Sequence, residues 1–143
     1  MSATAAKPDS LTTGQAPATR FQGTFSGRAD QVRMVRAAVA AHLGDCPATA
    51  DAVLVASEIA ANAILHSRSR GTCFTIRVEL YSDWVRLECQ DAGGAWRGKR
   101  HTDGRPHGLS VVEALTGPAA WGVQVTGDGG RVVWARLAWE AGA

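Results

Sequence analysis

Three polar side chains share one side of a predicted helix whose composition otherwise suits burial. Glu58, Asn62 and His66 recur at intervals of four residues, and at about 100° per residue they fall within an arc of about 80°. Val55 lies within that arc and Ile59 about 20° beyond it, so the carboxylate, amide and imidazole are not segregated onto a solvated face. Buried polar groups need hydrogen-bonding partners. The pattern therefore predicts a ligand among these partners.

Each of the three side chains offers a different chemistry. An amide oxygen is a hard, neutral ligand that suits Mg²⁺, an ion that also keeps waters and phosphate oxygens. Asn62 is therefore the predicted metal ligand, and the alternative is a core amide with internal hydrogen bonds. For Glu58 the structural alternative is an ion pair with a nearby arginine. His66 stands near the predicted end of the helix, where a bond to the backbone is favoured over direct contact with a ligand.

The end of a predicted strand offers a second group of candidate residues. Asp91 stands where that strand stops and a glycine pair, Gly93 and Gly94, begins. A carboxylate in this place can accept a hydrogen bond from an exocyclic amine, while glycines allow a flat ring to approach the backbone. Asp91 and Gly93 therefore predict a site for adenine. The alternative is an aspartate that forms an ordinary turn.

A helix start further along the chain is a candidate phosphate site. Gly108 precedes the predicted helix that begins at Leu109, and backbone N–H groups at a helix start attract phosphate oxygens. The chain has no G-x-x-x-x-G-K-S/T sequence. The loop before this helix carries the basic residues Arg97, Lys99, Arg100 and Arg105. These side chains either fold over a triphosphate and offset its charge or belong to an ordinary solvated loop. Arg100 and Arg105 are the predicted contacts, with Arg105 favoured for its place beside the helix start.

Length and composition set the broad class of protein. The chain has 143 residues, a hydrophobic share of 45% and a formal net charge of +2. Residues 1–17 have almost nothing to bury and predict a disordered leader, which leaves a single domain at 18–140. The charge is too small to argue for binding to nucleic acid or to an anionic membrane. No stretch approaches the ~20 apolar residues that cross a bilayer and no signal pattern is present, so we expect a cytoplasmic protein.

The cysteines indicate no special chemistry. Three are present, an odd number without C-x-x-C spacing, and this predicts reduced structural thiols rather than a disulfide framework.

Hydrophobic periodicity predicts both helices and strands. A helical period marks segments 29–43, 49–67 and 109–117, and a period of two marks strands. The strands are expected at 19–25, 73–80, 84–90, 120–126 and 131–139. Together these elements predict an α/β (α+β) two-layer sandwich, in which an antiparallel or mixed sheet is covered on one face by about three helices.

The order of these motifs resembles the GHKL family of ATP-binding domains, over nearly the whole predicted domain. Residues 58–66 match the family's first box, E-x-x-x-N-A-x-x-H. Residues 91–93 match the start of the second box and 107–112 the end of the third. Segments 121–122 and 133–135 look like the family's closing strands. The small size and short lid are most similar to the anti-sigma-factor serine/threonine protein kinases of actinobacterial type.

The resemblance implies a Bergerat ATP-binding fold with ATP and Mg²⁺ as bound groups. It also implies that Glu58 is the base that orients or deprotonates an attacking hydroxyl. In that interpretation the protein sequesters a sigma factor and phosphorylates an anti-anti-sigma antagonist of the STAS type. Family likeness further suggests a homodimer. The sequence does not name the sigma factor, the antagonist or the process that they control.

Two positions depart from the family pattern. Ala95 replaces a glycine of the second box, and Pro106 replaces the first glycine of the third. Their backbones have less freedom than glycine, which predicts weaker nucleotide binding or slower turnover. These departures leave open an alternative, a catalytically silent switch module that binds partners or nucleotide. Direct binding of nucleic acid is not expected, because the basic loop lacks interleaved aromatic residues.

Overall fold

A computed structural model describes residues 16–66, 72–93, 109–117 and 119–139 of the protein. All of the predicted helices and strands are present in it. In chain order they are β1 (Thr19–Ser26), the short 3-10 helix η2 (Ala29–Gln31), α1 (Val32–Leu43), α2 (Thr49–His66), β2 (Cys73–Leu80), β3 (Trp84–Asp91), α3 (Leu109–Thr116), β4 (Trp121–Val125) and β5 (Arg131–Ala138). Most of the predicted leader, at 1–15, and the loop at 94–108 lie outside the described residues.

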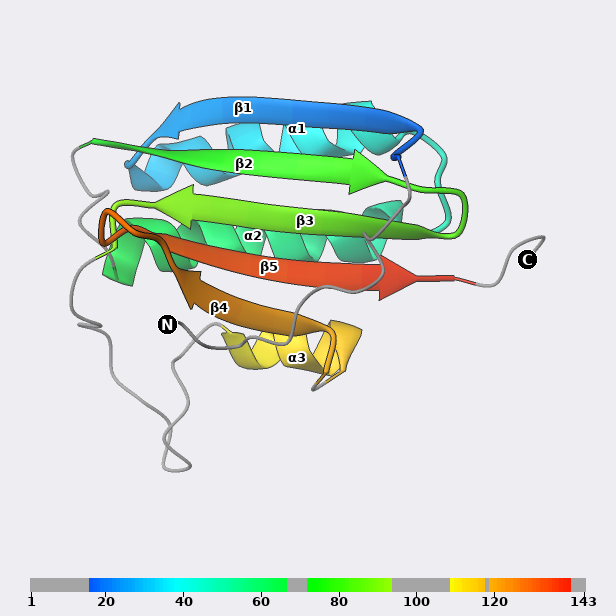
Figure 1. The fold of residues 1–143 in the computed structure, drawn as a ribbon. Helices are drawn as coiled ribbons and strands as arrows, with labels where there is room; N and C mark the ends of the chain where they lie inside the picture. Colours follow the sequence, from blue (N-terminus) through cyan, green and yellow to red (C-terminus); the bar gives the residue numbers. More distant parts are fainter. Residues whose placement is uncertain (1–15, 67–71, 94–108, 118, 140–143) are drawn as a thin grey trace.

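The strands form one five-stranded sheet in the order β1-β2-β3-β5-β4. Every neighbouring pair is antiparallel, so the antiparallel form of the predicted sheet is confirmed for the described strands. Helices α1, α2 and α3 all lie on one face of this sheet (Figure 1). The protein is therefore an α+β two-layer sandwich, as the periodicity predicts.

Alternation along the central strands builds the core between the two layers. In β2 the side chains of Phe74, Ile76 and Val78 are buried, and the residues between them are polar and face the other side of the sheet. In β3, Val85 and Leu87 are buried in the same way. A slip of one residue in either strand would place these apolar side chains on the open face, so the burial pattern specifies the register.

Helix α2 lies at the centre of the helical layer and contacts α1, α3 and strands β2, β3 and β5. Its buried side includes the small residues Ala52, Ala56, Ala60 and Ala63, which allow neighbouring backbones to approach closely. Thr49 begins the helix, and its hydroxyl donates to the carbonyls of Gly44 and Cys46 at 3.1 and 2.9 Å. These bonds fix the connection from α1, so the central helix is anchored at its first turn.

Several element boundaries differ from the sequence prediction, and two of these differences have a local cause. The segment predicted as one helix at 29–43 begins with the separate 3-10 turn η2. Its start has no side-chain cap, and Asp30 is paired with Arg28 instead at 3.2 Å, so nothing favours a regular first α-turn. At the other boundary Asp91 does not follow β3 but is its last residue, paired with Arg131 of β5.

The three cysteines are free thiols: Cys46 is half-buried, Cys73 is exposed and Cys89 is buried. Burial raises the pKa of the Cys89 thiol well above its ordinary value, so this side chain behaves as a small apolar core residue. Among the helices in the described ranges, none combines the length and apolar composition needed to span a bilayer.

Candidate nucleotide site

Asn62 is the clearest candidate for a ligand-binding residue. Its side chain lies on α2 and the residue is only 3% exposed. Neither Nδ2 nor Oδ1 has a hydrogen-bond partner among the described residues. A buried amide without partners costs about 1–3 kcal/mol. The alternative of a core amide requires internal hydrogen bonds, and no described residue supplies them. The amide therefore fits a site completed by a ligand.

Glu58 lies one turn before Asn62 and is half-buried. No hydrogen bond or ion pair joins its carboxylate to another residue within the described segments. The ion-pair alternative would need an arginine from outside those segments. Glu58 stands at the border between the buried and exposed sides of α2, where a carboxylate can meet both a bound molecule and an approaching one.

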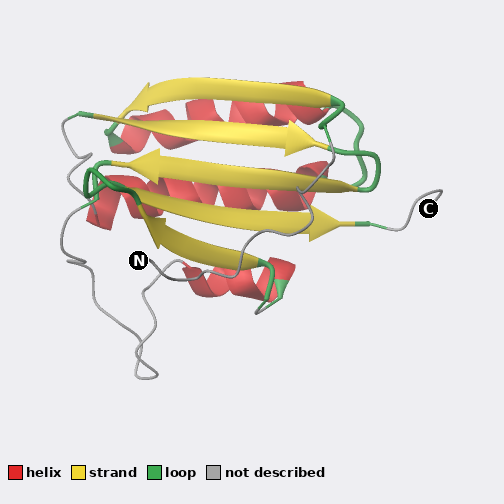
Figure 2. Cartoon of the chain, viewed as in Figure 1, coloured by secondary structure: helices red, strands yellow, loops and turns green. Residues whose placement is uncertain are grey.

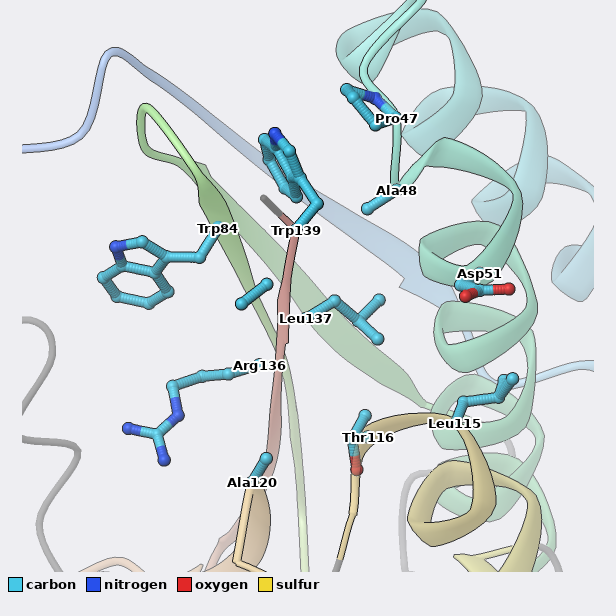
Figure 3. Close-up of a pocket in the computed structure, with 11 residues that line it drawn as sticks. Pro47, Ala48, Asp51, Trp84, Leu115, Thr116, Ala120, Arg136, Leu137 and Trp139 are labelled. Atoms are coloured by element: carbon cyan, nitrogen blue, oxygen red, sulfur yellow. The ribbon is translucent and has the colours of Figure 1, made fainter. Parts of the chain in front are cut away.

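The edge of α2 that carries these two residues faces α3. Asp51, Glu58 and Asn62 lie within an arc of about 40° on the helix. Asp51 lines a cleft together with Leu115 and Thr116 at the end of α3 (Figure 3). Because Asp51 shares this cleft with the end of α3, we infer that Glu58 and Asn62 lie on the same α3-facing edge, further along the helix.

The start of α3 lies near the level of Glu58. The two helices run in opposite directions (Figure 1), and the seven residues from Asp51 to Glu58 span about 10 Å, as do the seven from Thr116 back to Leu109. Leu109 is buried in the core beneath this point, and Asn62 lies about one turn beyond it. A phosphate group at the start of α3 would therefore be close to the unpaired amide.

Asp91 is already engaged at both carboxylate oxygens. Its Oδ2 accepts from Arg131 Nη2 at 3.0 Å and from Nε at 3.3 Å, and its Oδ1 accepts from the backbone N–H of Gly93 at 2.7 Å. Burial raises the pKa of the Asp91 carboxyl, against the opposing effects of Arg131 and the Gly93 N–H. Oδ2 already accepts two bonds, whereas Oδ1 accepts one and keeps a further lone pair. Acceptance from an adenine amine is therefore chemically available at Oδ1.

Gly93 has a local structural reason to be glycine. Its φ is +73°, and a Cβ at this position would lie 2.0 Å from the carbonyl oxygen of Gly129. The backbone at Gly93 therefore lies close to the backbone of the turn between β4 and β5. Whether a flat ring also approaches this backbone stays a prediction.

The elements of the candidate site meet at one end of the sandwich. The end of α2, the end of β3, the start of α3 and the β4–β5 turn all lie at this end (Figure 1). Of the predicted site residues, Glu58, Asn62, Asp91 and Leu109 belong to these elements, and Gly93 follows β3 by two residues. Arg100, Arg105 and Gly108 lie outside the described residues, as do Ala95 and Pro106.

Two clefts lined by described residues lie elsewhere. One, of about 370 Å³, is at the opposite end of the sandwich between the start of α2, the end of α3 and the end of β5. The other, of about 440 Å³, lies over β1 and β2. Neither includes Glu58, Asn62 or Asp91. The candidate site therefore depends on the unpaired amide and on helix geometry, not on cavity size.

Arg131 is a site residue that sequence reasoning missed. It lies directly opposite Asp91 across β3 and β5, and these strands are separated by α3 and β4 in the chain. Local periodicity does not reveal such a pairing. The sequence feature that could have indicated Arg131 is its place at the start of a strand, directly after a glycine-rich turn. A charged side chain that is buried in such a place needs a partner of opposite charge.

Comparisons with known proteins add no family assignment. Neither the models of protein families nor the curated protein sequences yielded a match to this chain. In the described segments there is also no group of three or more His, Cys, Asp or Glu side chains suited to a metal ion.

Proposed function

We propose that the protein binds ATP and Mg²⁺ where α2, β3 and α3 converge, and that it is an anti-sigma factor with serine/threonine kinase activity toward an anti-anti-sigma antagonist. The observation that carries this proposal is the buried amide of Asn62, whose two polar atoms lack partners among the described residues. The two-layer α+β sandwich is compatible with a Bergerat fold. The sequence resemblance of the three boxes supplies the choice of nucleotide and of protein partners.

The roles of the residues follow from their positions. Asn62 Oδ1 would hold the metal, and the start of α3 would receive phosphate oxygens. Bound there, Mg²⁺ supplies positive charge that stabilises the transferring phosphoryl group. Glu58 accepts a hydrogen bond from the acceptor hydroxyl and takes its proton as that oxygen bonds to the γ-phosphorus. The bond from phosphorus to the β–γ bridging oxygen breaks, and ADP leaves.

A protein substrate agrees with the surroundings of Glu58. Leu54 and Leu65 are 44% and 57% exposed, and both lie within about 40° of Glu58 on the helix. Exposed large apolar residues on each side of a carboxylate suit contact with a folded protein better than a free small alcohol. The acceptor hydroxyl is therefore proposed to arrive on a protein surface that covers these leucines.

Calorimetric titration with ATP, with and without Mg²⁺, tests the nucleotide site. Wild-type protein should bind in a Mg²⁺-dependent manner, and Asn62→Ala should weaken binding at least about tenfold, because a charge-assisted contact is worth about 1.5–3 kcal/mol. Ser57→Ala, on the same helix but on another side, is the matched control and should bind like wild type. Absence of ATP binding by the wild-type protein would overturn the proposal.

Transfer of radiolabelled γ-phosphate to a candidate STAS-type antagonist tests the chemistry. Glu58→Gln should retain ATP binding and lose transfer by about 10²-fold or more, the usual contribution of a general base. Full transfer by this variant would remove Glu58 from the mechanism.

A second function is favoured by the buried Asp91–Arg131 pair. Because Arg131 already occupies Oδ2 of Asp91, the proposed base-recognition carboxylate is less available than a solvent-facing one. The protein would then be a switch module that binds nucleotide or partners without turnover. Tight ATP binding without formation of ADP or phosphoprotein would favour this alternative over the kinase.

A further inference from the structure

The helices lie on one face of the sheet and leave the opposite face to the strands alone (Figure 2). The side chains of that opposite face take no part in the candidate nucleotide site. No helix or strand of the described part covers this open face. Cross-strand register forms one row from Gln22, Arg77, Glu88 and Trp134. The adjacent row is formed by Arg20, Glu79, Arg86 and Arg136. Each row crosses β1, β2, β3 and β5, so the open face presents an ordered polar surface.

Glu88 holds two of the arginines in place. Its Oε2 accepts from Arg77 Nη1 and its Oε1 from Arg86 Nη1, each at 2.5 Å. Arg77 Nε also donates to Gln22 Oε1 at 3.0 Å. Side chains that are already ordered lose less conformational entropy when a partner binds, so these guanidinium groups are prepared for an interface.

Trp134 lies close to two arginines of the open face, Arg86 and Arg136. The guanidinium carbons of Arg86 and Arg136 are 5.8 and 5.2 Å from its ring centroid. Gly122, its neighbour on β4, leaves room for the indole, since a Cβ there would be 2.9 Å from Trp134 Nε1. Trp134 is itself only 3% exposed, so it supports the two guanidinium groups rather than contacting a partner. Arginine is among the residue types that contribute most to protein interfaces.

The charge of the open face is unbalanced. The two rows hold four arginines and two glutamates, a surplus of two positive charges. Arg86 and Arg136 stand directly opposite each other on β3 and β5. Glu88 pairs with Arg86, and Arg136 donates from Nη2 to the carbonyl oxygen of Ala119 at 3.3 Å. Each guanidinium group has several N–H donors, so a further carboxylate placed beside both of them would add charge-assisted bonds.

Arg136 also joins the open face to the end cleft of about 370 Å³. In Figure 3 Arg136 and Trp84 lie on the side of β5 away from α2, whereas Leu137 points toward the helices. Trp139 and Leu115 line the same cleft. A bound segment can therefore place a carboxylate on the arginines and an apolar side chain in the adjacent cleft.

We propose that the open face, centred on Arg86, Trp134 and Arg136, docks an acidic segment of another protein. A second copy of the chain is disfavoured because it would present the same positive surplus. Nucleic acid is disfavoured because Glu79 and Glu88 repel phosphates and because Trp134, only 3% exposed, offers no free ring face for a base. This surface is independent of the nucleotide site and does not require the proposed kinase activity.

Fluorescence anisotropy with a labelled oligoglutamate peptide, at low salt, tests the surface on the full chain. Wild-type protein should bind the peptide, and Arg136→Gln should weaken binding about tenfold through the loss of a charge-assisted contact. Arg36→Gln is the matched control, because Arg36 is exposed on α1 in the other layer and its loss changes the net charge equally. It should bind within about twofold of wild type.

A second variant removes a negative charge instead of a positive one, and it tests the proposal even if circular dichroism shows that Arg136→Gln does not fold. Glu79→Gln raises the positive surplus and should tighten binding of the peptide. Equal losses in Arg36→Gln and Arg136→Gln, no gain in Glu79→Gln, or no binding by wild type would each overturn the proposal. Tighter binding of a single-stranded oligonucleotide than of oligoglutamate would overturn it in favour of nucleic acid.

Discussion

Asp91 and Arg131 face each other across β3 and β5 as a buried ion pair, with Oδ2 3.0 Å from Nη2. Their side chains are 0% and 7% exposed. Both groups sit at the end of the sandwich where the candidate site is built. The pair therefore links the stability of that end to the availability of the Asp91 carboxylate.

Removal of Arg131 should be strongly destabilising. Arg131→Ala leaves a buried carboxylate without its cation, and losses of this kind are about 3–5 kcal/mol in free energy of unfolding. Urea denaturation at neutral pH measures the change. The exposed Arg36→Ala serves as control and should change stability little. The double variant Asp91→Leu with Arg131→Met should recover much of the loss, and no recovery would show that the unpaired buried carboxylate is not its cause.

The raised pKa of Asp91 gives a signed pH dependence. Because burial raises the folded-state pKa above the ordinary 3.8, the folded state holds this proton more tightly than the unfolded state. The contribution of Asp91 to stability is therefore fully present below the unfolded pKa and is lost as pH rises through the folded pKa. Unfolding free energies measured across this range should fall more steeply with rising pH in wild type than in Asp91→Asn. Parallel curves would show that Asp91 is not the titrating group.

Gly93 should be intolerant of even a small side chain. Gly93→Ala combines a positive φ with a Cβ 2.0 Å from the Gly129 carbonyl oxygen, so the β4–β5 turn must move away from β3. Gly117→Ala is the matched control, because its φ is also positive, at +98°, but no atom lies within 4 Å of the added Cβ. Thermal melts should show a larger loss for Gly93→Ala, since only that variant adds a steric clash to the backbone strain. Equal losses of thermal stability in the two variants would mean that backbone strain at positive φ accounts for the whole effect.

Local patterns predicted the elements, and non-local pairing limited the prediction of the site. The spacing of Glu58 and Asn62 depends only on helix geometry, so their shared edge could be inferred from sequence. The exposure of Glu58 and the missing partners of Asn62 required tertiary packing. Arg131 could not be placed beside Asp91 because the β3–β5 register is set by the whole sheet. For the same reason the strand extends to Asp91, where the ion pair stabilises the last rung of the ladder.

Asn62 offers a test that separates a ligand site from a structural amide. Because its Nδ2 and Oδ1 lack described partners, Asn62→Leu replaces an unsatisfied polar group with an apolar one of similar branched shape. In the absence of ligand this variant should be as stable as wild type or more stable by about 1 kcal/mol, while Mg²⁺-dependent ATP binding is lost. Urea denaturation and calorimetry on the same preparations measure the two effects. Asn62→Asp keeps an oxygen ligand for the metal and should retain some Mg²⁺-dependent binding. A marked loss of stability in Asn62→Leu would instead show that the amide is satisfied within the protein, and the nucleotide site would lose its principal support.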